Sequence, residues 1–155
     1  MYKRQKHILA KFHEHIANQR KDFQFKQVFR LFQRADLIAI EDLKVSNLIR
    51  NKHLSKSIAD VGWGGFRIKL QNKAESAGLR VEAVNPKNTS QRCCVCEVIV
   101  KKSLAVRVHR CYNCGIELDR DHNAAINILA RGIEQYKAAV ASRGEFAVVN
   151  ALVET

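Results

Sequence analysis

The chain has 155 residues, a net charge of +12 and a hydrophobic content of 46%. This length suffices for one domain with its own core, or for one domain that carries a small module. The sequence lacks the run of about 18 apolar residues that a membrane span needs. Its N-terminus also lacks the apolar stretch of a signal peptide. We therefore expect a cytoplasmic protein without a membrane partner.

Positive charge is concentrated at the N-terminus. Residues 1–34 hold nine Lys and Arg against the two acids Glu14 and Asp22, a local excess of +7. Such an excess suits a polyanion, of which nucleic acid is the commonest. A solvated helix face would explain the same charge, so composition alone leaves both interpretations open.

The first predicted element is a helix over residues 6–34. Large apolar side chains recur there at spacings of three and four, and Lys and Arg fill the other face. The pattern changes near Asp22, and no good N-cap precedes the first turn, which is typical of a truncated chain. The recurring apolar positions are Ile8, Phe12, Ile16, Phe25, Phe29 and Phe32.

A short apolar run, Leu37–Ile40, predicts a buried strand of a sheet covered on both faces, and Leu79–Val84 predicts a second strand that ends before Asn85-Pro86. A polar connection and a helix over residues 57–77 separate them. The glycines of Gly62–Gly65 are expected to kink or split this helix, and Gly78 is expected to cap it.

The remaining elements are a hairpin and a last helix. The segment "VIVKKSLAVRVH" between the cysteine pairs predicts two strands joined by a turn. The last helix is predicted over Asn123–Tyr136. Its expected apolar face consists of Ala125, Ile128, Leu129, Ile133 and Tyr136. The whole order indicates an α/β domain with a cysteine insert.

All five cysteines lie between residues 93 and 114. Four of them form two C-x-x-C pairs, Cys93 with Cys96 and Cys111 with Cys114, separated by 14 residues. Two such turns can place four thiolates around one ion, which is the geometry of structural zinc. A full set of thiolates leaves no open position for substrate, so this zinc is not expected to be catalytic.

The fifth thiol, Cys94, is expected to point away from the metal, although Cys94 with Cys96 could also chelate an ion. Basic side chains lie between the cysteine pairs and are candidates for nucleic-acid contacts. Alternatively, the cysteine segment only stabilises the fold, and these charges are solvated. These basic residues are Lys101, Lys102, Arg107 and Arg110.

Two acids stand at the ends of predicted elements. Glu41 closes the first strand, where it is either exposed at the sheet edge or aimed into a site. Asp121 begins the last helix, where either it or Asp119 can act as the N-cap. Paired carboxylates can hold Mg²⁺. The pattern alone does not show that Glu41 and Asp121 meet.

Several motifs resemble one family in the same order. "IAIEDL", "NPKNTSQRCCVC" and "CYNCGIELDRDHNAAINILARG" are similar to the C-terminal half of TnpB/OrfB proteins, which insertion sequences encode and which are related to type V CRISPR effectors. "HEHIANQRKDFQFK" and the segment that ends in "RVEAVNP" extend the resemblance over residues 5–132.

The resemblance implies part of an RNase H-like (RuvC-type) nuclease domain with an inserted zinc ribbon. It implies that Glu41 and Asp121 are catalytic acids that hold Mg²⁺. Members act as RNA-guided DNA endonucleases, and older names call them transposases, so DNA and a guide RNA are the expected partners. The matching zinc ligands are Cys93, Cys96, Cys111 and Cys114.

The sequence departs from the family pattern in three ways. No G-x-D-x-G-like motif with the first catalytic Asp precedes the first helix, so we expect the chain to be inactive without the missing N-terminal part of the protein. Glu97 replaces the Gly that usually follows the second cysteine, and Asn72 replaces an aromatic residue. A non-catalytic zinc-ribbon module that binds nucleic acid is the alternative reading.

The expected organisation has five segments. They are a basic helical segment (1–35), part of the nuclease core (36–90), the zinc ribbon (91–118), the last catalytic helix (119–136) and a tail (137–155).

Overall fold

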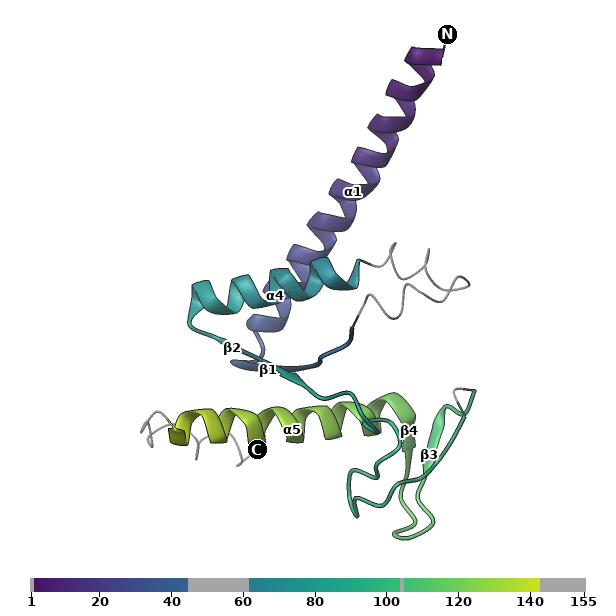
Figure 1. Ribbon diagram of the computed structural model, residues 1–155, viewed down its shortest axis with the longest axis vertical. Coiled ribbons are helices and arrows are strands. Elements are labelled where there is room, and N and C mark those ends of the chain that lie inside the picture. Colours follow the sequence, from purple (N-terminus) through teal and green to yellow (C-terminus); the bar gives the residue numbers. More distant parts are fainter. Residues whose placement is uncertain (1, 45–61, 104, 143–155) are drawn as a thin grey trace. The chain divides into compact units, whose positions relative to one another are not determined.

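The computed structural model describes residues 2–44, 62–103 and 105–142 (Figure 1). Contacts divide the chain into two compact units. The first unit comprises Met1–Asp36 and Lys44–Arg80, and the second comprises Leu37–Leu43 and Val81–Thr155. Each unit is described by itself. Within the described ranges, no helix is both long and apolar enough to cross a membrane.

Helices α1 and α4 pack together in the first unit. Helix α1 spans Tyr2–Phe32 and α4 spans Trp63–Ala77. Val28 and Gln24 of α1 and Leu70 and Ala74 of α4 are buried. The Gln24 amide donates to the carbonyl of Gly62 at 3.1 Å, and its oxygen accepts from Lys69 at 2.9 Å. The contact between the helices is therefore part apolar and part polar.

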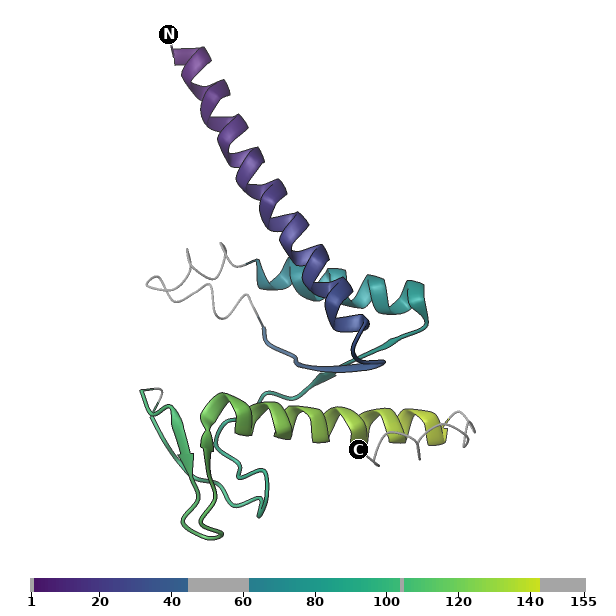
Figure 2. The same cartoon turned by 180° about the vertical axis from the view of Figure 1, so that it is seen from behind.

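Helix α1 confirms the predicted first helix but not its apolar face. The helix runs unbroken past Asp22, as both cartoon views show (Figures 1 and 2). The residues at the expected apolar positions Ile8, Phe12, Ile16 and Phe29 are 46–61% exposed. Helix α4 covers only the row of Gln24 and Val28, so among the described residues no element buries the predicted stripe.

Helix α4 differs from the prediction at its glycines. It begins after Gly62, which adopts a left-handed conformation, and continues through Gly64 and Gly65 without interruption. Gly78 is the left-handed C-cap that was expected, with its N–H directed at the carbonyls of Ala74 and Glu75. The predicted helical residues 57–61 lie outside the described residues.

Both predicted strands are present, but β1, which was predicted to be buried in a sheet covered on both faces, is half-buried along its whole length in a sheet of two strands. Strand β1 spans Leu37–Glu41 and pairs with β2, Arg80–Val84. Backbone hydrogen bonds join Arg80 to Asp36 near the beginning of the two strands and Asp42 to Val84 near their end. Since early residues meet early ones and late residues meet late ones, the strands run parallel.

The predicted hairpin is wrong in its position. Strand β3, Val108–Arg110, pairs antiparallel with β4, Glu117–Asp119, so the hairpin encloses the second cysteine pair. Around the first pair, only an isolated bridge joins Arg92 and Ile99. Each cysteine turn is thus the tip of its own paired segment, because the x-x spacing itself reverses the chain.

Helix α5, Arg120–Ser142, begins earlier and ends later than predicted, and its buried face is different. Ala125 and Leu129, expected inside, are exposed. The buried positions are Asn123, Asn127, Gly132 and Val140. Apolar periodicity did not predict Asn123, Asn127 and Gly132 as buried, because two of these residues carry amides and the third is a glycine.

Gly132 lies where α5 approaches β1 most closely. A Cβ atom at this position would lie 2.6 Å from the Cβ of Ala39 and 3.7 Å from the Cβ of Glu82. The first distance is far shorter than a normal carbon–carbon contact of about 3.5–4.0 Å. Only glycine therefore lets this turn of the helix rest on the strand.

We predict that Gly132→Ala lowers the free energy of unfolding by about 1–2 kcal/mol. The overpacking against Ala39 outweighs the gain in helix propensity of about 1 kcal/mol. Urea denaturation followed by circular dichroism measures the change. Gly64→Ala is the matched control, because nothing lies within 4 Å of its added Cβ, and we expect it to be neutral or stabilising. Equal stabilisation by both substitutions would contradict the close packing.

Candidate functional site

Four thiols converge in the second unit. Ligand atoms of Cys93, Cys96, Cys111 and Cys114 all lie within 4.8 Å of one another. The Sγ atoms of Cys93 and Cys114 are 3.6 Å apart, and those of Cys96 and Cys111 are 3.4 Å apart. Tetrahedral zinc with bonds of about 2.3 Å requires sulfur atoms about 3.8 Å apart. The donor set therefore fits a metal ion such as zinc.

The two cysteine turns have the same backbone pattern. Cys93 N–H donates to Val98 and Glu97 N–H donates back to Cys93; Cys111 likewise donates to Ile116 and Gly115 to Cys111. The four hydrogen bonds measure 2.9–3.0 Å. Both turns also need a left-handed residue after the second cysteine, with φ of 65° at Glu97 and 74° at Gly115. Two equivalent turns thus present their thiols to one point.

Local hydrogen bonds prepare Cys96 for a metal. The side chain of Asn113 and the backbone N–H of Val98 lower the pKa of this thiol to about 6. Desolvation and the neighbouring thiols, Cys96 among them, raise the pKa of Cys114 to about 12, so the cluster favours a thiolate at Cys96, the form that binds metal ions.

Cys94 is not part of the thiol cluster. Its backbone N–H donates to Oδ1 of Asn123 at 3.0 Å, and its side chain is half-buried. Burial, followed by the charge of Cys93, raises the pKa of its thiol. Cys93 is therefore the member of this neighbouring pair that can act as a ligand, as the two-residue spacing predicted.

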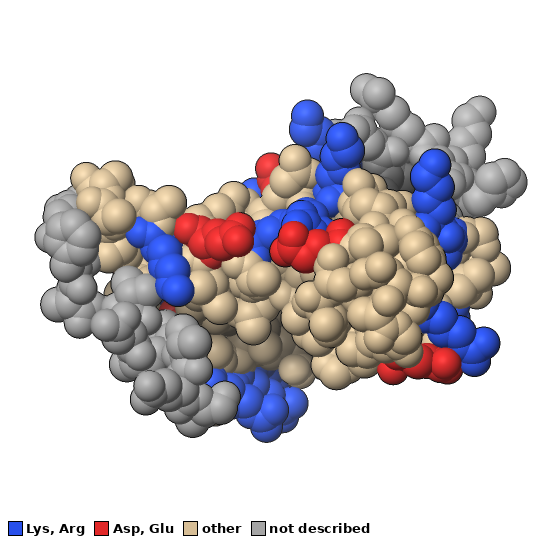
Figure 3. Space-filling model, turned by 90° about the horizontal axis from the view of Figure 1, so that it is seen from below, with Lys and Arg blue, Asp and Glu red and all other residues tan. Residues whose placement is uncertain are grey.

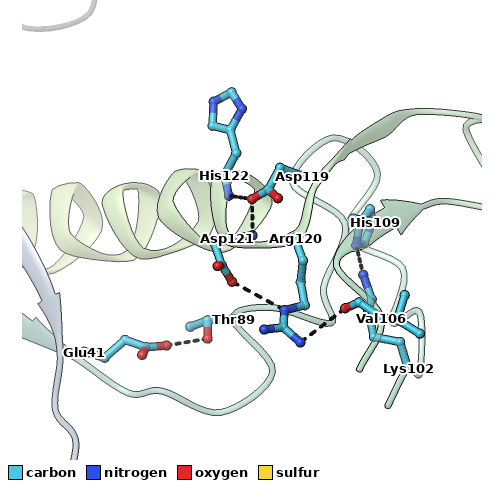
Figure 4. A network of polar contacts seen from close by, with 9 residues as sticks. All are labelled: Glu41, Thr89, Lys102, Val106, His109, Asp119, Arg120, Asp121 and His122. Carbon is cyan, nitrogen blue, oxygen red and sulfur yellow. Dashed lines mark hydrogen bonds and ion pairs between the residues drawn. The ribbon is translucent and has the colours of Figure 1, made fainter. Parts of the chain in front are cut away.

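The N-terminus of α5 divides two roles between two acids (Figure 4). Oδ1 of Asp119 accepts hydrogen bonds from the backbone N–H groups of Asp121 at 2.8 Å and His122 at 3.1 Å, which lower the pKa of Asp119. Asp119 is the cap. The side chain of Asp121 is 73% exposed, and its carboxylate lies 3.4 Å from Nε of Arg120. Its carboxylate therefore stays available to a ligand.

Glu41 lies at the end of β1 and is held by a buried threonine. Oγ1 of Thr89 donates to Oε1 of Glu41 at 2.5 Å. Figure 4 shows Asp121 pointing from α5 toward the side on which Glu41 and Thr89 lie. The many contacts between β1 and α5 bring the elements that carry the two acids together.

Arg120 links the acid end of α5 to the cysteine segment. Its guanidinium donates to the carbonyl of Val106 at 3.2 Å, and its backbone N–H donates to Arg107 at 2.7 Å. Its side chain is only 13% exposed. Arg120 therefore fixes the first turn of α5 against the chain that leads into β3.

The four candidate basic residues have different environments. Lys101 and Arg107 are exposed, while Arg110 forms an ion pair with Glu117 at 2.8 Å. Nζ of Lys102 lies 2.5 Å from Nδ1 of the buried His109. Burial lowers the pKa of both groups, which favours their neutral forms.

These side chains still line one hollow. The hollow has a volume of about 430 Å³. Its apolar lining consists of Val100, Val106 and Val108, and the four basic residues complete the lining. On the face that Figure 3 shows, the Lys and Arg of the described residues are spread over several places, with Asp and Glu among them. The hollow is therefore a local basic site, and its contact with nucleic acid stays a prediction.

Sequence reasoning missed the residues that hold the acids and cysteines in place. Thr89, Asn123 and Asn127 are all buried, and Arg120 is nearly so. Polar side chains in a loop and on a helix usually face solvent, so their type gave no signal. Their spacing did offer one, since Asn123 and Asn127 are four residues apart on one helix face.

Comparison with known proteins now places these features. The family model "Cas12f1-like, TNB domain" matches residues 63–128, which include all four clustered cysteines. The protein named "Putative RNA-guided DNA endonuclease" of Streptomyces pristinaespiralis is 35% identical over 133 residues, and "TnpB-like protein L79" of Acanthamoeba polyphaga mimivirus is 31% identical over 134. These matches cover 84% and 83% of the chain. The chain is a relative of the TnpB-like proteins.

The relationship extends over one part of these longer proteins. The chain spans 33% of the Streptomyces protein and 26% of the mimivirus protein. A solved structure entitled "Cryo-EM structure of the Cas12f1-sgRNA-target DNA complex" has a similar fold, with a TM-score of 0.50 and 20% identity. It covers 83% of this chain, which covers 39% of that one. The expected family and the mixed α/β class are thereby confirmed.

We predict that Glu97→Gly raises the free energy of unfolding by up to about 1 kcal/mol. A left-handed conformation costs a non-glycine residue about 1–2 kcal/mol. The ion pair with Arg92, at 2.5 Å, is exposed and offsets at most about 1 kcal/mol of this cost. Urea denaturation of the zinc-loaded protein measures the difference.

Gly115→Ala is the matched control in the second turn. Nothing lies within 4 Å of its added Cβ, so the substitution tests the conformation alone and should destabilise the protein. Arg92→Gln removes the ion pair without changing φ at residue 97. If Glu97→Gly and Arg92→Gln changed stability in the same direction and amount, strain at Glu97 would be excluded.

Proposed function

We propose that the chain is the C-terminal part of a TnpB/OrfB-like, Mg²⁺-dependent DNA endonuclease encoded by a transposon. Glu41 and Asp121 are two of its metal-binding acids in a RuvC-type core, and the four cysteines hold a structural zinc ion in an inserted ribbon. DNA is the substrate and a guide RNA is a partner. The remaining part of the protein supplies the first catalytic Asp.

The observation that carries this proposal is the state of Asp121. Asp119 already caps α5, so Asp121 serves no capping role and keeps an exposed carboxylate at the positive end of a helix. Glu41 is held at the end of the strand that packs on the same helix. This arrangement of the two acids supports a role in cation binding over a purely structural role.

The chemistry follows from the acids. In two-metal hydrolysis, Mg²⁺ ions activate water and stabilise the leaving oxygen of a phosphodiester. Among the described residues, the cysteines form the only group of three or more side chains that could hold a metal. Glu41 and Asp121 alone can therefore hold a single cation but bind a pair of cations poorly, which supports a chain that is inactive by itself.

The second candidate function is a zinc-ribbon module that binds nucleic acid without cleaving it. The basic hollow that contains Lys101, Lys102, Arg107 and Arg110 favours it. A zinc ribbon that only binds nucleic acid would not require an exposed Asp121 that does not cap the helix, or a Glu41 that Thr89 holds in place. The two candidates thus differ in the role of the acids and share the role of the basic residues.

The first test measures cleavage. We expect the zinc-loaded chain to bind labelled DNA but not to cut it in Mg²⁺ or Mn²⁺, and to cut it when the N-terminal part of a related full-length protein is added. Asp121→Ala and Glu41→Ala should abolish cleavage by the mixture and leave DNA binding unchanged. Cleavage by a mixture that contains either variant would remove the acids from the proposal.

The second test concerns the cysteines. Replacing zinc by Co²⁺ should give the visible absorption of a tetrahedral tetrathiolate site, with one ion per chain. Cys114→Ser should weaken retention of the ion by at least tenfold, whereas Cys94→Ser should retain it. If both variants lost the ion to the same extent, Cys94 would be a ligand, and the proposed set of four cysteines would be wrong.

A further inference from the structure

Two buried asparagines connect α5 to the loop that precedes the first cysteine turn. Asn123 is fully buried and Asn127 is 8% exposed. Nδ2 of Asn123 donates to the carbonyl of Arg92 at 2.8 Å, and its Oδ1 accepts from the N–H of Cys94 at 3.0 Å. These two bonds hold the backbone on both sides of Cys93.

Asn127 holds the same loop four residues further along the helix. Its Nδ2 donates to the carbonyls of Thr89 at 2.9 Å and Arg92 at 2.7 Å. Both donor hydrogens of the amide are therefore used. Loss of this side chain would leave the Thr89 carbonyl without its donor, whereas the Arg92 carbonyl would keep the bond from Asn123. An unsatisfied buried carbonyl is costly in a water-poor environment.

Thr89 carries the constraint to Glu41. The threonine is 4% exposed, and its hydroxyl lies 2.5 Å from Oε1 of Glu41 and 3.1 Å from the carbonyl of Pro86. A hydroxyl has one proton, and the shorter contact to a charged oxygen is the stronger one. One carboxylate oxygen of Glu41 is thereby held, and the other is left for a further ligand.

A single loop thus serves two sites. Residues 89–94 begin at the hydroxyl that holds Glu41 and end at the turn that contains Cys93, and the asparagine pair of α5 fastens both ends. The same helix carries Asp121 in its first turn. The geometry of the acid pair therefore depends on how this loop is held.

We propose that Thr89 is a positioning residue that orients Glu41 for a divalent cation with oxygen ligands, and that Asn127 anchors Thr89. This inference rests on the proposed role of Glu41. Partners that orient a metal ligand typically change metal affinity by 10–100-fold when they are removed. Thr89 touches neither the cation nor the substrate and acts only through Glu41.

The test uses Mn²⁺ as the probe, with bound and free ion distinguished by electron paramagnetic resonance on the zinc-loaded chain. We expect Glu41→Gln to abolish site binding and Thr89→Val to weaken it about tenfold. Thr89→Ser restores the hydroxyl and should return the affinity to within about twofold of the parent. Asn127→Ala should weaken Mn²⁺ binding as Thr89→Val does.

The outcomes separate this inference from the proposed function. If Glu41→Gln binds Mn²⁺ like the parent, or the parent binds none, the proposed cation site is wrong. If Glu41→Gln loses the ion but Thr89→Val keeps it, the cation site stands and the positioning role is overturned. Failure of Thr89→Ser to recover affinity would also overturn it, since the hydroxyl would not be the active group.

A second measurement does not depend on the cation. The equilibrium constant of unfolding should rise about tenfold in Thr89→Val, the effect expected from losing a hydrogen bond to a charged group. In a Glu41→Ala background, the same substitution should change it less than threefold, because the acceptor is already gone. Equal effects in both backgrounds would show that Thr89 and Glu41 are not coupled.

Discussion

The hydrogen bonds from Asn123 and Asn127 to the backbone of residues 89–94 are the interactions on which the second unit depends. They fasten an irregular loop to a helix at points where no apolar side chain could satisfy the backbone. The loop then delivers Cys93 to the thiol cluster and Thr89 to Glu41. One pair of amides therefore holds the loop that carries both a thiol of the cysteine cluster and the partner of Glu41.

The start of α5 shows how the chain keeps a carboxylate available. Carboxylates near a helix N-terminus accept hydrogen bonds from the free backbone N–H groups, so a single acid there would act as the cap. Asp119 takes that role, and Arg120 ties the turn to Val106. Asp121 can then face outward without loss of the cap. In the D-R-D order, Asp119 therefore caps the helix and Arg120 contacts both Val106 and Asp121.

The strands and the cysteine pairs could be predicted from the sequence because both depend on local pattern. The apolar run Leu37–Ile40 marked β1, the segment Leu79–Val84 before Asn85-Pro86 marked β2, and the x-x spacing marked the thiol cluster. The buried face of α5 could not be found in this way, since Asn123, Asn127 and Gly132 are chosen for hydrogen bonding and close approach. The hairpin was misplaced because each cysteine turn reverses the chain without any apolar alternation.

The apolar stripe of α1 shows a different limit of sequence reasoning. Periodicity reports that a helix has an apolar face, but it does not say what covers that face. Here α4 buries Gln24 and Val28, while Phe12 and Phe29 stay exposed. Gln24 also accepts a hydrogen bond from Lys69 of α4. The apolar periodicity of the sequence could not have predicted this polar contact.

The described part of the second unit buries few apolar side chains. Among its described residues, the buried apolar side chains are those of Val84, Cys93, Cys111 and Val140, and four polar ones are buried beside them. So little apolar area cannot by itself offset the entropy of ordering the loops around the cysteines. An ion held by the four thiols would supply that free energy directly, because it would bind only when both turns have formed. Metal ligation and buried amides would then stabilise this unit where a larger domain uses a hydrophobic core.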